Sequence, residues 1–313
     1  MKAIRFHEYG APDVLRHEDI ERPVPGPGEA LIRVAATSFN PVDAGIRAGT
    51  RQGPFPVALP HVPGADVAGT IEELGDGTAE VAVGEEVVGF LPIVPDGASA
   101  EYVVAPAEIL TRAPAQIPLA DAAALPTVGL AAWQMLFEHG GLTAGQRVLV
   151  NGAGGAVGPY AVQLAKQAGA TVIATASPLS AARVEAAGAD QVIDHTSTTV
   201  ATALGAQVDL VLNLAPIEPE EFKALPALVR DGGAVTSSTL WMPAPTDEAR
   251  GVRGVDVVTR SDAKDLARLV ELIDAGELRV DVAERVPLSE LAAVHARSEA
   301  GQLSGKVVIT VAA

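Results

Sequence analysis

The chain has 313 residues, 48% of them hydrophobic, and this combination predicts a globular protein of about two domains. Its formal net charge of −17 argues against a nucleic-acid partner, because binding a phosphate backbone requires a basic face. The sequence contains no cysteine, which excludes disulfides, thiolate zinc sites and cysteine nucleophiles.

The N-terminal part of the chain predicts a β domain. Short alternating runs at 30–36, 67–74, 86–91 and 100–105 are separated by proline and glycine, which is typical of an antiparallel, barrel-like sheet. Residues 119–136 predict helix. The apolar segment 119–137 contains Asp121 and Pro126, which fits a buried helix pair better than a membrane span. We therefore expect a cytoplasmic protein that makes no membrane contact.

The middle of the chain alternates strands with helices. Residues 147–151 predict a buried strand, followed by a glycine-rich turn and a helix at 159–169. Further strands are expected at 171–176, 191–194, 208–214 and 234–238, and further helices at 180–187 and 220–229. This alternation predicts a doubly wound parallel sheet covered by helices on both faces.

The last part of the chain predicts a return to the first domain. An amphipathic helix at 262–275 precedes strands at 279–286 and 306–311, with a helix between them. We expect residues 1–118 and 261–313 to form the substrate domain and residues 119–260 to form the dinucleotide-binding domain.

The turn after the first strand of the middle domain has the pattern Ala153-x-Gly155-x-x-Gly158. Small residues let a pyrophosphate approach the main chain, and the N-terminus of the following helix offers free N–H groups. The residues predicted to bind the cofactor here are Ala153, Gly154, Gly155, Ala156, Val157 and Gly158. The alternative is a glycine turn in an α/β domain that binds no nucleotide.

The end of the second strand favours NADPH over NADH. A fold specific for NAD places an acidic residue there for the ribose hydroxyl, but this chain reads Thr175-Ala176-Ser177-Pro178. Thr175 and Ser177 are expected to contact the cofactor there; Ser177 can donate to a phosphate, Arg183 is the nearest cation, and His195 can close the same pocket. Alternatively, Arg183 and His195 are ordinary surface residues.

Three further positions are expected against the nicotinamide, where the strands of a parallel sheet end. Leu214 and Ala215 would face the ring, and Leu240 would cover it from the next strand end. Such apolar residues are also common in cores.

Several motifs together resemble the medium-chain dehydrogenase/reductase superfamily, within it the zinc-free quinone oxidoreductases. The resemblance covers almost the whole chain and rests on Asn40-Pro41-Val42-Asp43, Pro63-Gly64-Ala65-Asp66-Val67-Ala68-Gly69, Ala100-Glu101-Tyr102, Leu125-Pro126-Thr127, the glycine turn and Gly305-Lys306-Val307-Val308. It implies an α/β protein with a GroES-like β-barrel catalytic domain, a Rossmann domain and a homodimer.

The resemblance also implies a reaction without zinc. The family's zinc enzymes have a cysteine ligand where this chain has Asn40 and a histidine ligand where it has Ala65, so we expect no metal. Without a Lewis acid, the site suits hydride delivery to an acceptor that is already electrophilic, with hydrogen-bond donors stabilising the charge on oxygen.

Asn40 and Thr127 are the predicted catalytic residues, and both would also contact the cofactor, as the resemblance implies. Asn40 could instead be the N-cap of a helix that begins at Pro41, and the Thr127 hydroxyl could satisfy main-chain groups. Several relatives have a tyrosine shortly after Asp43, where this chain reads Ala44-Gly45-Ile46. The proton donor therefore stays open.

We expect an NADPH-dependent reductase that transfers hydride to a small hydrophobic quinone or a similar electrophilic carbonyl bound between the domains. One alternative is a reductase of the carbon–carbon double bond of enones or alkenals. The other is an NADPH-binding sensor or scaffold with little turnover.

Overall fold

The computed structural model describes residues 1–239 and 241–311 and divides the chain into two compact units. Unit 1 comprises Met1–Thr127 and the segment from Ser261 onward, and unit 2 comprises Val128–Arg260. Each unit has its own sheet.

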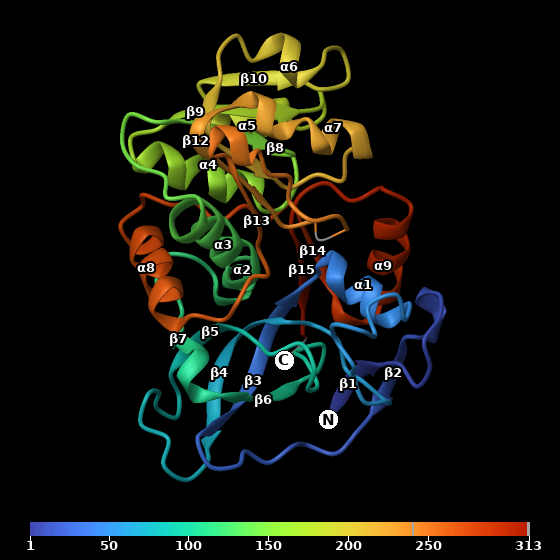
Figure 1. The fold of residues 1–313 in the computed structure, drawn as a ribbon. Helices are drawn as coiled ribbons and strands as arrows, with labels where there is room; N and C mark the ends of the chain where they lie inside the picture. The colour runs from blue at the N-terminus through green and yellow to red at the C-terminus, as the bar shows by residue number, and fades with distance from the viewer. Residues whose placement is uncertain (240, 312–313) are drawn as a thin grey trace. The chain divides into compact units, whose positions relative to one another are not determined.

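Unit 1 is built on a seven-stranded sheet in the order β14-β15-β3-β4-β5-β7, with β6 paired to β3 and a separate β1-β2 pair (Figure 1). Its strands are β1 (Lys2–Arg5), β2 (Arg16–Asp19), β3 (Glu29–Ser38), β4 (Asp66–Leu74), β5 (Glu86–Phe90), β6 (Tyr102–Pro106), β7 (Leu110–Arg112), β14 (Glu284–Pro287) and β15 (Val307–Thr310). Its helices are α1 (Pro41–Arg47), α2 (Leu119–Ala122), α8 (Ala263–Asp274) and α9 (Leu291–Glu299).

The C-terminal segment is an integral part of this sheet. Strand β15 pairs antiparallel with β3, with Ile309 opposite Thr37, and parallel with β14. The buried side chains of Ile32, Val67 and Ile309 belong to one hydrophobic core. The return of the chain to the first domain is therefore seen directly.

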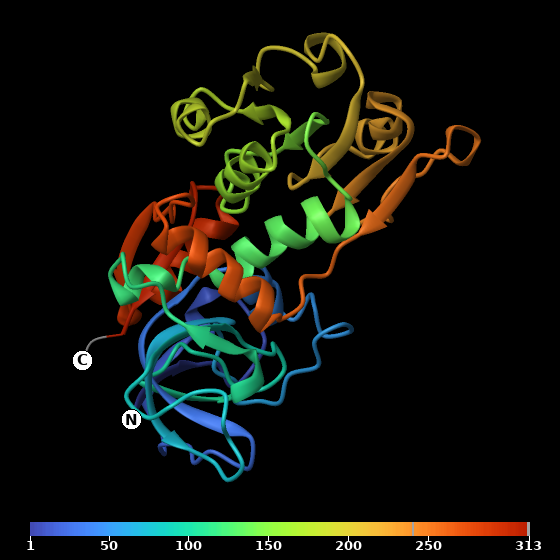
Figure 2. The same cartoon turned by 90° about the vertical axis from the view of Figure 1, so that its left-hand side faces the viewer.

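Unit 2 is a six-stranded parallel sheet in the order β10-β9-β8-β11-β12-β13, with helices on both faces (Figures 1 and 2). Its strands are β8 (Arg147–Asn151), β9 (Thr171–Ala176), β10 (Gln191–Asp194), β11 (Val208–Asn213), β12 (Val229–Ser237) and β13 (Arg253–Asp256). Its helices are α4 (Gly158–Gln167), α5 (Ala181–Ala186), α6 (Val200–Ala203) and α7 (Pro219–Lys223), preceded by α3 (Pro126–Trp133) and a π-helix (Gln134–His139).

The faces of this sheet are buried by alternate residues of each strand. Leu149, Ile173 and Val211 pack with Phe222 and Val200, so one face is covered by α7 and α6. Helices α4 and α5 contact each other and strands β8, β9 and β10. Because the six strands are parallel, their carboxyl ends and the turns that follow them lie at the same edge of the sheet.

Two predicted elements differ from the structure. The helix expected at 220–229 ends at Lys223, because Pro226 lies in a short 3-10 turn (Leu225–Leu228) and Val229 already begins β12. The strand expected at 279–286 is limited to Glu284–Pro287, because its partner β15 begins at Val307, opposite Glu284.

The boundary between the units also lies later in the chain than the predicted position after residue 118. Helix α2 contacts β3 and β4 of unit 1, and Thr127 donates hydrogen bonds to Asp66. Residues 119–127 therefore belong with unit 1, and unit 2 ends at Arg260.

Candidate active site

A fully buried carboxylate, that of Asp66, organises a polar cluster in unit 1. Asp66 begins β4 and has no exposed surface. It accepts hydrogen bonds from the Ser38 hydroxyl, the Asn40 amide at 2.9 Å, the Lys306 ammonium at 3.0 Å, and the main-chain N–H and hydroxyl of Thr127, each at 2.7 Å. The cluster therefore joins the end of β3, the start of α3 and the residue before β15.

Asp66 and Lys306 form a buried ion pair. Burial alone would raise the pKa of Asp66, but the Lys306 ammonium and the hydroxyl and amide donors lower it below its ordinary value. Asp66 is therefore ionised, and its oxygens accept hydrogen bonds from several donors. A buried ion pair is tolerated when its charged groups are hydrogen-bonded in this way.

The Asn40 side chain lies between these two charges. Its Nδ2 donates to Asp66, and its Oδ1 accepts from Lys306 at 2.6 Å. An amide nitrogen carries two hydrogens, so within the described chain one N–H of Asn40 remains available to another acceptor. Asn40 is also the N-cap of α1, which begins at Pro41, and the Asp43 carboxylate accepts from the Asn40 N–H at 2.9 Å.

Thr127 provides a hydrogen-bond acceptor, in contrast to the donor on Asn40. Its hydroxyl proton is donated to Asp66 at 2.7 Å. Because a hydroxyl has only one proton, the Thr127 oxygen can only accept from a further group. One carboxylate thus orients a free donor on Asn40 and a free acceptor on Thr127.

Lys306, like Asp66 and Ser38, is a member of this cluster to which sequence analysis gave no role. The sequence signal is a lysine placed directly before three strongly apolar residues, 307–309, all of which are buried. Lys306 itself is only 1% exposed, which for a lysine requires a paired charge.

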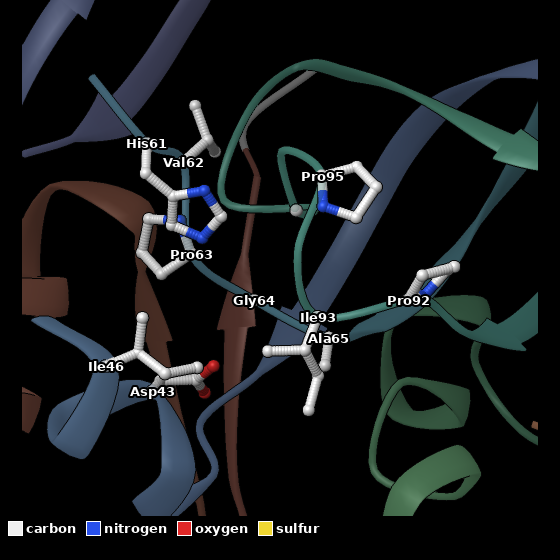
Figure 3. Close-up of a pocket in the computed structure, with 11 residues that line it drawn as sticks. Asp43, Ile46, His61, Val62, Pro63, Gly64, Ala65, Pro92, Ile93 and Pro95 are labelled. Carbon is white, nitrogen blue, oxygen red and sulfur yellow. The ribbon is translucent and has the colours of Figure 1, made fainter. Parts of the chain in front are cut away.

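A hollow lies beside the cluster, with Ala65 in its wall immediately before Asp66 (Figure 3). It contains about 260 Å³ of empty space, part of it open to solvent. Its apolar wall includes Ile46, Pro63, Pro92, Ile93 and Pro95. Two titratable side chains, Asp43 and His61, also line it, so the hollow combines a rigid apolar surface with proton-bearing groups.

Burial raises the pKa of Asp43 to about 7, although the Asn40 N–H and the charge of Lys306 partly oppose this. Near neutral pH this carboxyl group is therefore a mixture of protonated and ionised forms.

In unit 2, the predicted dinucleotide turn connects β8 to α4. Gly152 has a φ of 88°, in the left-handed region that favours glycine. Gly158 packs against Ala153 so closely that a Cβ would lie 2.0 Å from the Ala153 carbonyl oxygen. Glycine at these two positions is explained by the fold of the protein itself.

Gly155 has no such explanation. It is exposed, and a Cβ there would meet only the Gly152 carbonyl oxygen, at an ordinary 3.5 Å. A phosphate that must approach the main chain does explain a glycine at this position. The turn therefore fits a dinucleotide, with Ala156 and Val157 leading into the N-terminus of α4.

The end of β9 carries hydroxyls and a guanidinium. Ser177 follows the strand, and its Oγ lies 3.4 Å from the Oγ of Ser180, a residue that sequence analysis did not name. Arg183 of α5 donates to the main-chain oxygen of Gly154 in the glycine turn. The main-chain N–H of His195 donates to the last residue of β9 at 3.3 Å. Ser177 and His195 thus directly follow neighbouring parallel strands, and Arg183 contacts the glycine turn.

Thr175 has a structural role beneath the same turn. It is 1% exposed, and its hydroxyl accepts from the Gly152 N–H at 2.8 Å and donates to Asn151 at 2.9 Å. Its hydroxyl is therefore engaged by the turn, and a cofactor contact of Thr175 stays a prediction.

Leu214 and Ala215 lie beside the turn at the end of β11. The Leu214 N–H donates to Asn151 at 2.9 Å, and the Ala215 side chain borders Gly152. Both are half-buried. Leu240, the third residue expected against the nicotinamide, lies outside the described residues.

Two family models match the chain, the alcohol dehydrogenase GroES-like domain over residues 26–115 and the zinc-binding dehydrogenase over residues 187–309. A chloroplast envelope quinone oxidoreductase homolog from Arabidopsis thaliana is 32% identical, covering 99% of this chain and 98% of its own. The quinone oxidoreductase from Coxiella burnetii superposes with a TM-score of 0.90 at 30% identity, over 100% of this chain and 99% of its own. A mycobacterial protein complexed with NADPH superposes with a TM-score of 0.85 at 30% identity, over 99% of each chain.

The chain belongs to the medium-chain dehydrogenase/reductase superfamily. It lies in the zinc-free quinone oxidoreductase branch, with a GroES-like unit 1 and a Rossmann unit 2, as the sequence predicts. It is an oxidoreductase that uses a nicotinamide cofactor.

At the two positions where the resemblance implies zinc ligands in related enzymes, this chain has Asn40, whose amide is bonded to Asp66 and Lys306, and Ala65, whose side chain is a methyl group. In the described residues, no three His, Cys, Asp or Glu side chains are grouped as a metal site would require. Nor does any helix of that part of the chain combine the length and apolar character needed to cross a membrane.

Proposed function

We propose that this protein is an NADPH-dependent reductase that transfers hydride to a quinone or a similar electrophilic carbonyl without zinc. The observation that carries the proposal is the Asn40 N–H, oriented by the buried Asp66–Lys306 pair and not used within the described chain. A fixed donor of this kind stabilises an oxygen that gains negative charge during reduction. An acceptor that is already electrophilic needs no stronger Lewis acid.

Thr127 would orient the cofactor. A bound NADPH would supply the hydride, and its nicotinamide carries a carboxamide with N–H donors. The Thr127 oxygen can only accept, so it is matched to such a donor. The exposed Gly155 and the N-terminus of α4 would hold the pyrophosphate.

The preference for NADPH follows from the end of β9. Ser177, Ser180 and Arg183 supply hydroxyl and guanidinium donors, and the carboxylate that would select NADH is absent from 175–178. Arg183 donates to the Gly154 carbonyl in the glycine turn, and its guanidinium carries five donors in the planar fork that suits a phosphate. The similarity to a protein complexed with NADPH also supports this preference.

The cofactor proposal is tested by Arg183→Ala. We expect the KM for NADPH to rise roughly 10- to 100-fold and the KM for NADH to change little, because a hydrogen bond to a charged group contributes about 1.5–3 kcal/mol. Arg230→Ala is the control, since Arg230 is an exposed arginine of the same unit, paired with Asp209. An unchanged ratio of the KM for NADPH to the KM for NADH in Arg183→Ala would show that Arg183 does not bind the phosphate.

The acceptor proposal is tested by NADPH oxidation, followed by absorbance, with duroquinone and 3-penten-2-one in parallel. We expect turnover with the quinone and much less with NADH as donor. Turnover with the enone alone would assign the protein to the double-bond reductases. No consumption with either acceptor, despite NADPH binding, would contradict the proposed reductase activity.

A further inference from the structure

Reduction of a carbonyl acceptor requires a proton as well as a hydride, and the obvious donors in this chain are engaged elsewhere. Tyr160 is fully buried, and Tyr102 lies under the Arg22 guanidinium at 4.6 Å. The hydroxyl of Tyr9 donates to the main-chain oxygen of Val57 at 3.5 Å. Thr127 gives its only hydroxyl proton to Asp66.

His61 differs from these groups because it lines the hollow beside the Asp66 cluster and neither of its ring nitrogens makes a hydrogen bond within the described chain. Figure 3 shows the Nε2 edge of the ring turned toward the hollow. The hollow is partly open to solvent, so a polar atom of an acceptor can approach this edge of the ring.

The position of His61 is rigidly held. Its main chain pairs with Phe6 in both directions at 3.0 Å, and the two rings meet edge to face with centroids 5.5 Å apart. On the far side, Nδ1 lies 3.6 Å from the carboxylate of Asp96, which is itself fixed by the Val62 N–H at 2.8 Å. A carboxylate at Nδ1 stabilises the imidazolium and leaves Nε2–H as the donor.

The charged groups that face this ring are Asp96 behind it and Asp43 across the hollow. Burial lowers the pKa of His61 below its ordinary value, and the charge of Asp96 partly opposes this. Asp43 is the competing candidate for the donor, but its carboxylate already accepts the Asn40 N–H that begins α1. The Asp43 carboxylate is therefore already hydrogen-bonded, whereas neither ring nitrogen of His61 makes a hydrogen bond within the described chain.

We propose that His61, supported by Asp96, is the proton donor of this reductase and that the hollow beside Ala65 admits the carbonyl oxygen of the acceptor. This proposal rests on the proposed function. The acceptor gains a hydride, that is one proton and two electrons, and NADPH becomes NADP⁺. The Nε2–H bond of the imidazolium breaks, and an O–H bond forms on the acceptor oxygen. The neutral imidazole then takes a proton from water at the side where Asp96 is exposed, so one quinone, one NADPH and one proton give one hydroquinone and one NADP⁺.

The test is the pH profile of kcat/KM with duroquinone in the wild type, His61→Gln, Asp43→Asn and His17→Gln. In the wild type, kcat/KM should fall as pH rises, because the imidazolium is lost. His61→Gln should lower kcat/KM about a hundredfold and abolish this dependence, with the Kd for NADPH unchanged. His17, an exposed histidine of the same unit, should be replaceable without effect.

Three results would overturn the proposal. His61→Gln could retain kcat/KM within a factor of three with the same pH dependence, or the dependence could vanish only in Asp43→Asn, which would make Asp43 the donor. If the wild type reduces no acceptor at all, the proposed function fails and the donor role fails with it. The first two outcomes leave the reductase intact, so the two failures are distinguishable.

A second measurement covers a His61 variant that fails to fold. In wild-type protein with ¹³C-labelled histidine, duroquinone should shift the ring signal assigned to His61 and change its titration midpoint. No change in that signal at saturating duroquinone would overturn the proposal without any variant.

Discussion

Lys306 stabilises unit 1 through a buried charge. If it is replaced by methionine, the Asp66 carboxylate stays buried without a cation, which typically costs about 3–5 kcal/mol. We therefore expect Lys306→Met to lower the free energy of unfolding in urea by that amount. Lys166→Met is the control, because Lys166 and its partner Asp190 are 35% and 41% exposed. Such surface pairs contribute about 0–1 kcal/mol, so equal losses in the two variants would contradict the buried pair.

His295 sets a limit on acid stability. It is fully buried on α9, 5.0 Å from the ring of Phe39, with no hydrogen-bond partner for either nitrogen among the described residues. Burial, assisted by the charge of Arg47, lowers the pKa of His295 to about 3. The unfolded chain binds this proton near pH 6.5, so the native state loses stability as pH falls from about 6.5 toward 3.

We expect His295→Phe to remove this acid sensitivity. At pH 8 the two proteins should differ little in their free energies of unfolding. At pH 4.5 the wild type should have lost about 3 kcal/mol that the variant retains, since each unit of pKa difference corresponds to about 1.4 kcal/mol. Urea titrations at both pH values give the comparison, and parallel losses in the two proteins would show that His295 is not held neutral.

In the glycine turn between β8 and α4, we expect one glycine to be needed for cofactor binding and another for stability. Gly155→Ala places a methyl group in ordinary contact with the Gly152 carbonyl oxygen, so the melting temperature should stay within a few degrees, while the Kd for NADPH should rise roughly tenfold or more as phosphate approach is blocked. Gly158→Ala should instead reduce stability by about 1–3 kcal/mol, because its Cβ would overlap the Ala153 carbonyl. Unchanged NADPH binding by a folded Gly155→Ala variant would show that the pyrophosphate does not bind at this turn.

Helices and strands are predicted correctly from the sequence where a short stretch of residues determines them. The strands at Thr171–Ala176 and Gln191–Asp194 are found as expected, because each contains a short run of β-branched residues next to turn residues. It fails at residues 220–229 because the last of these residues is recruited into a strand that pairs with Val208, a tertiary contact that local periodicity does not contain.

The same distinction applies to the site. The glycine turn and the hydroxyls after β9 lie within one contiguous unit, so their order along the chain indicates their proximity. The role of Lys306 could not be predicted in this way, because its partner Asp66 is 240 positions away and is reached only through the pairing of β15 with β3.

For the whole molecule, we predict a homodimer formed through unit 2. Strand β13 is the last in its sheet, with exposed Trp241 and Val258 nearby, and Figure 2 shows this segment at the outer edge of the unit. An unpaired strand edge with apolar residues favours pairing with a second chain. Sedimentation velocity of the wild type at micromolar concentration should give a dimer.

Val258→Asp should shift this equilibrium toward monomer, since it places a charge at the proposed contact. Val83→Asp is the matched control, because Val83 is 63% exposed in unit 1 and Val258 is 61% exposed. A monomeric wild type, or equal dissociation in both variants, would argue against association through β13.

The pairing of Asp66 with Lys306 also has a consequence for synthesis of the chain on the ribosome. The two residues are 240 positions apart, and translation at about 5–20 residues per second separates their appearance by about 10–50 s. During that interval, unit 2 is contiguous and can fold, whereas the nascent carboxylate of Asp66 has no counter-ion and β3 lacks its partner β15. The residues that are first to emerge are therefore among the last to be completed, and chains stalled before residue 306 would hold a folded nucleotide domain tethered to an open first domain that chaperones and proteases can recognise.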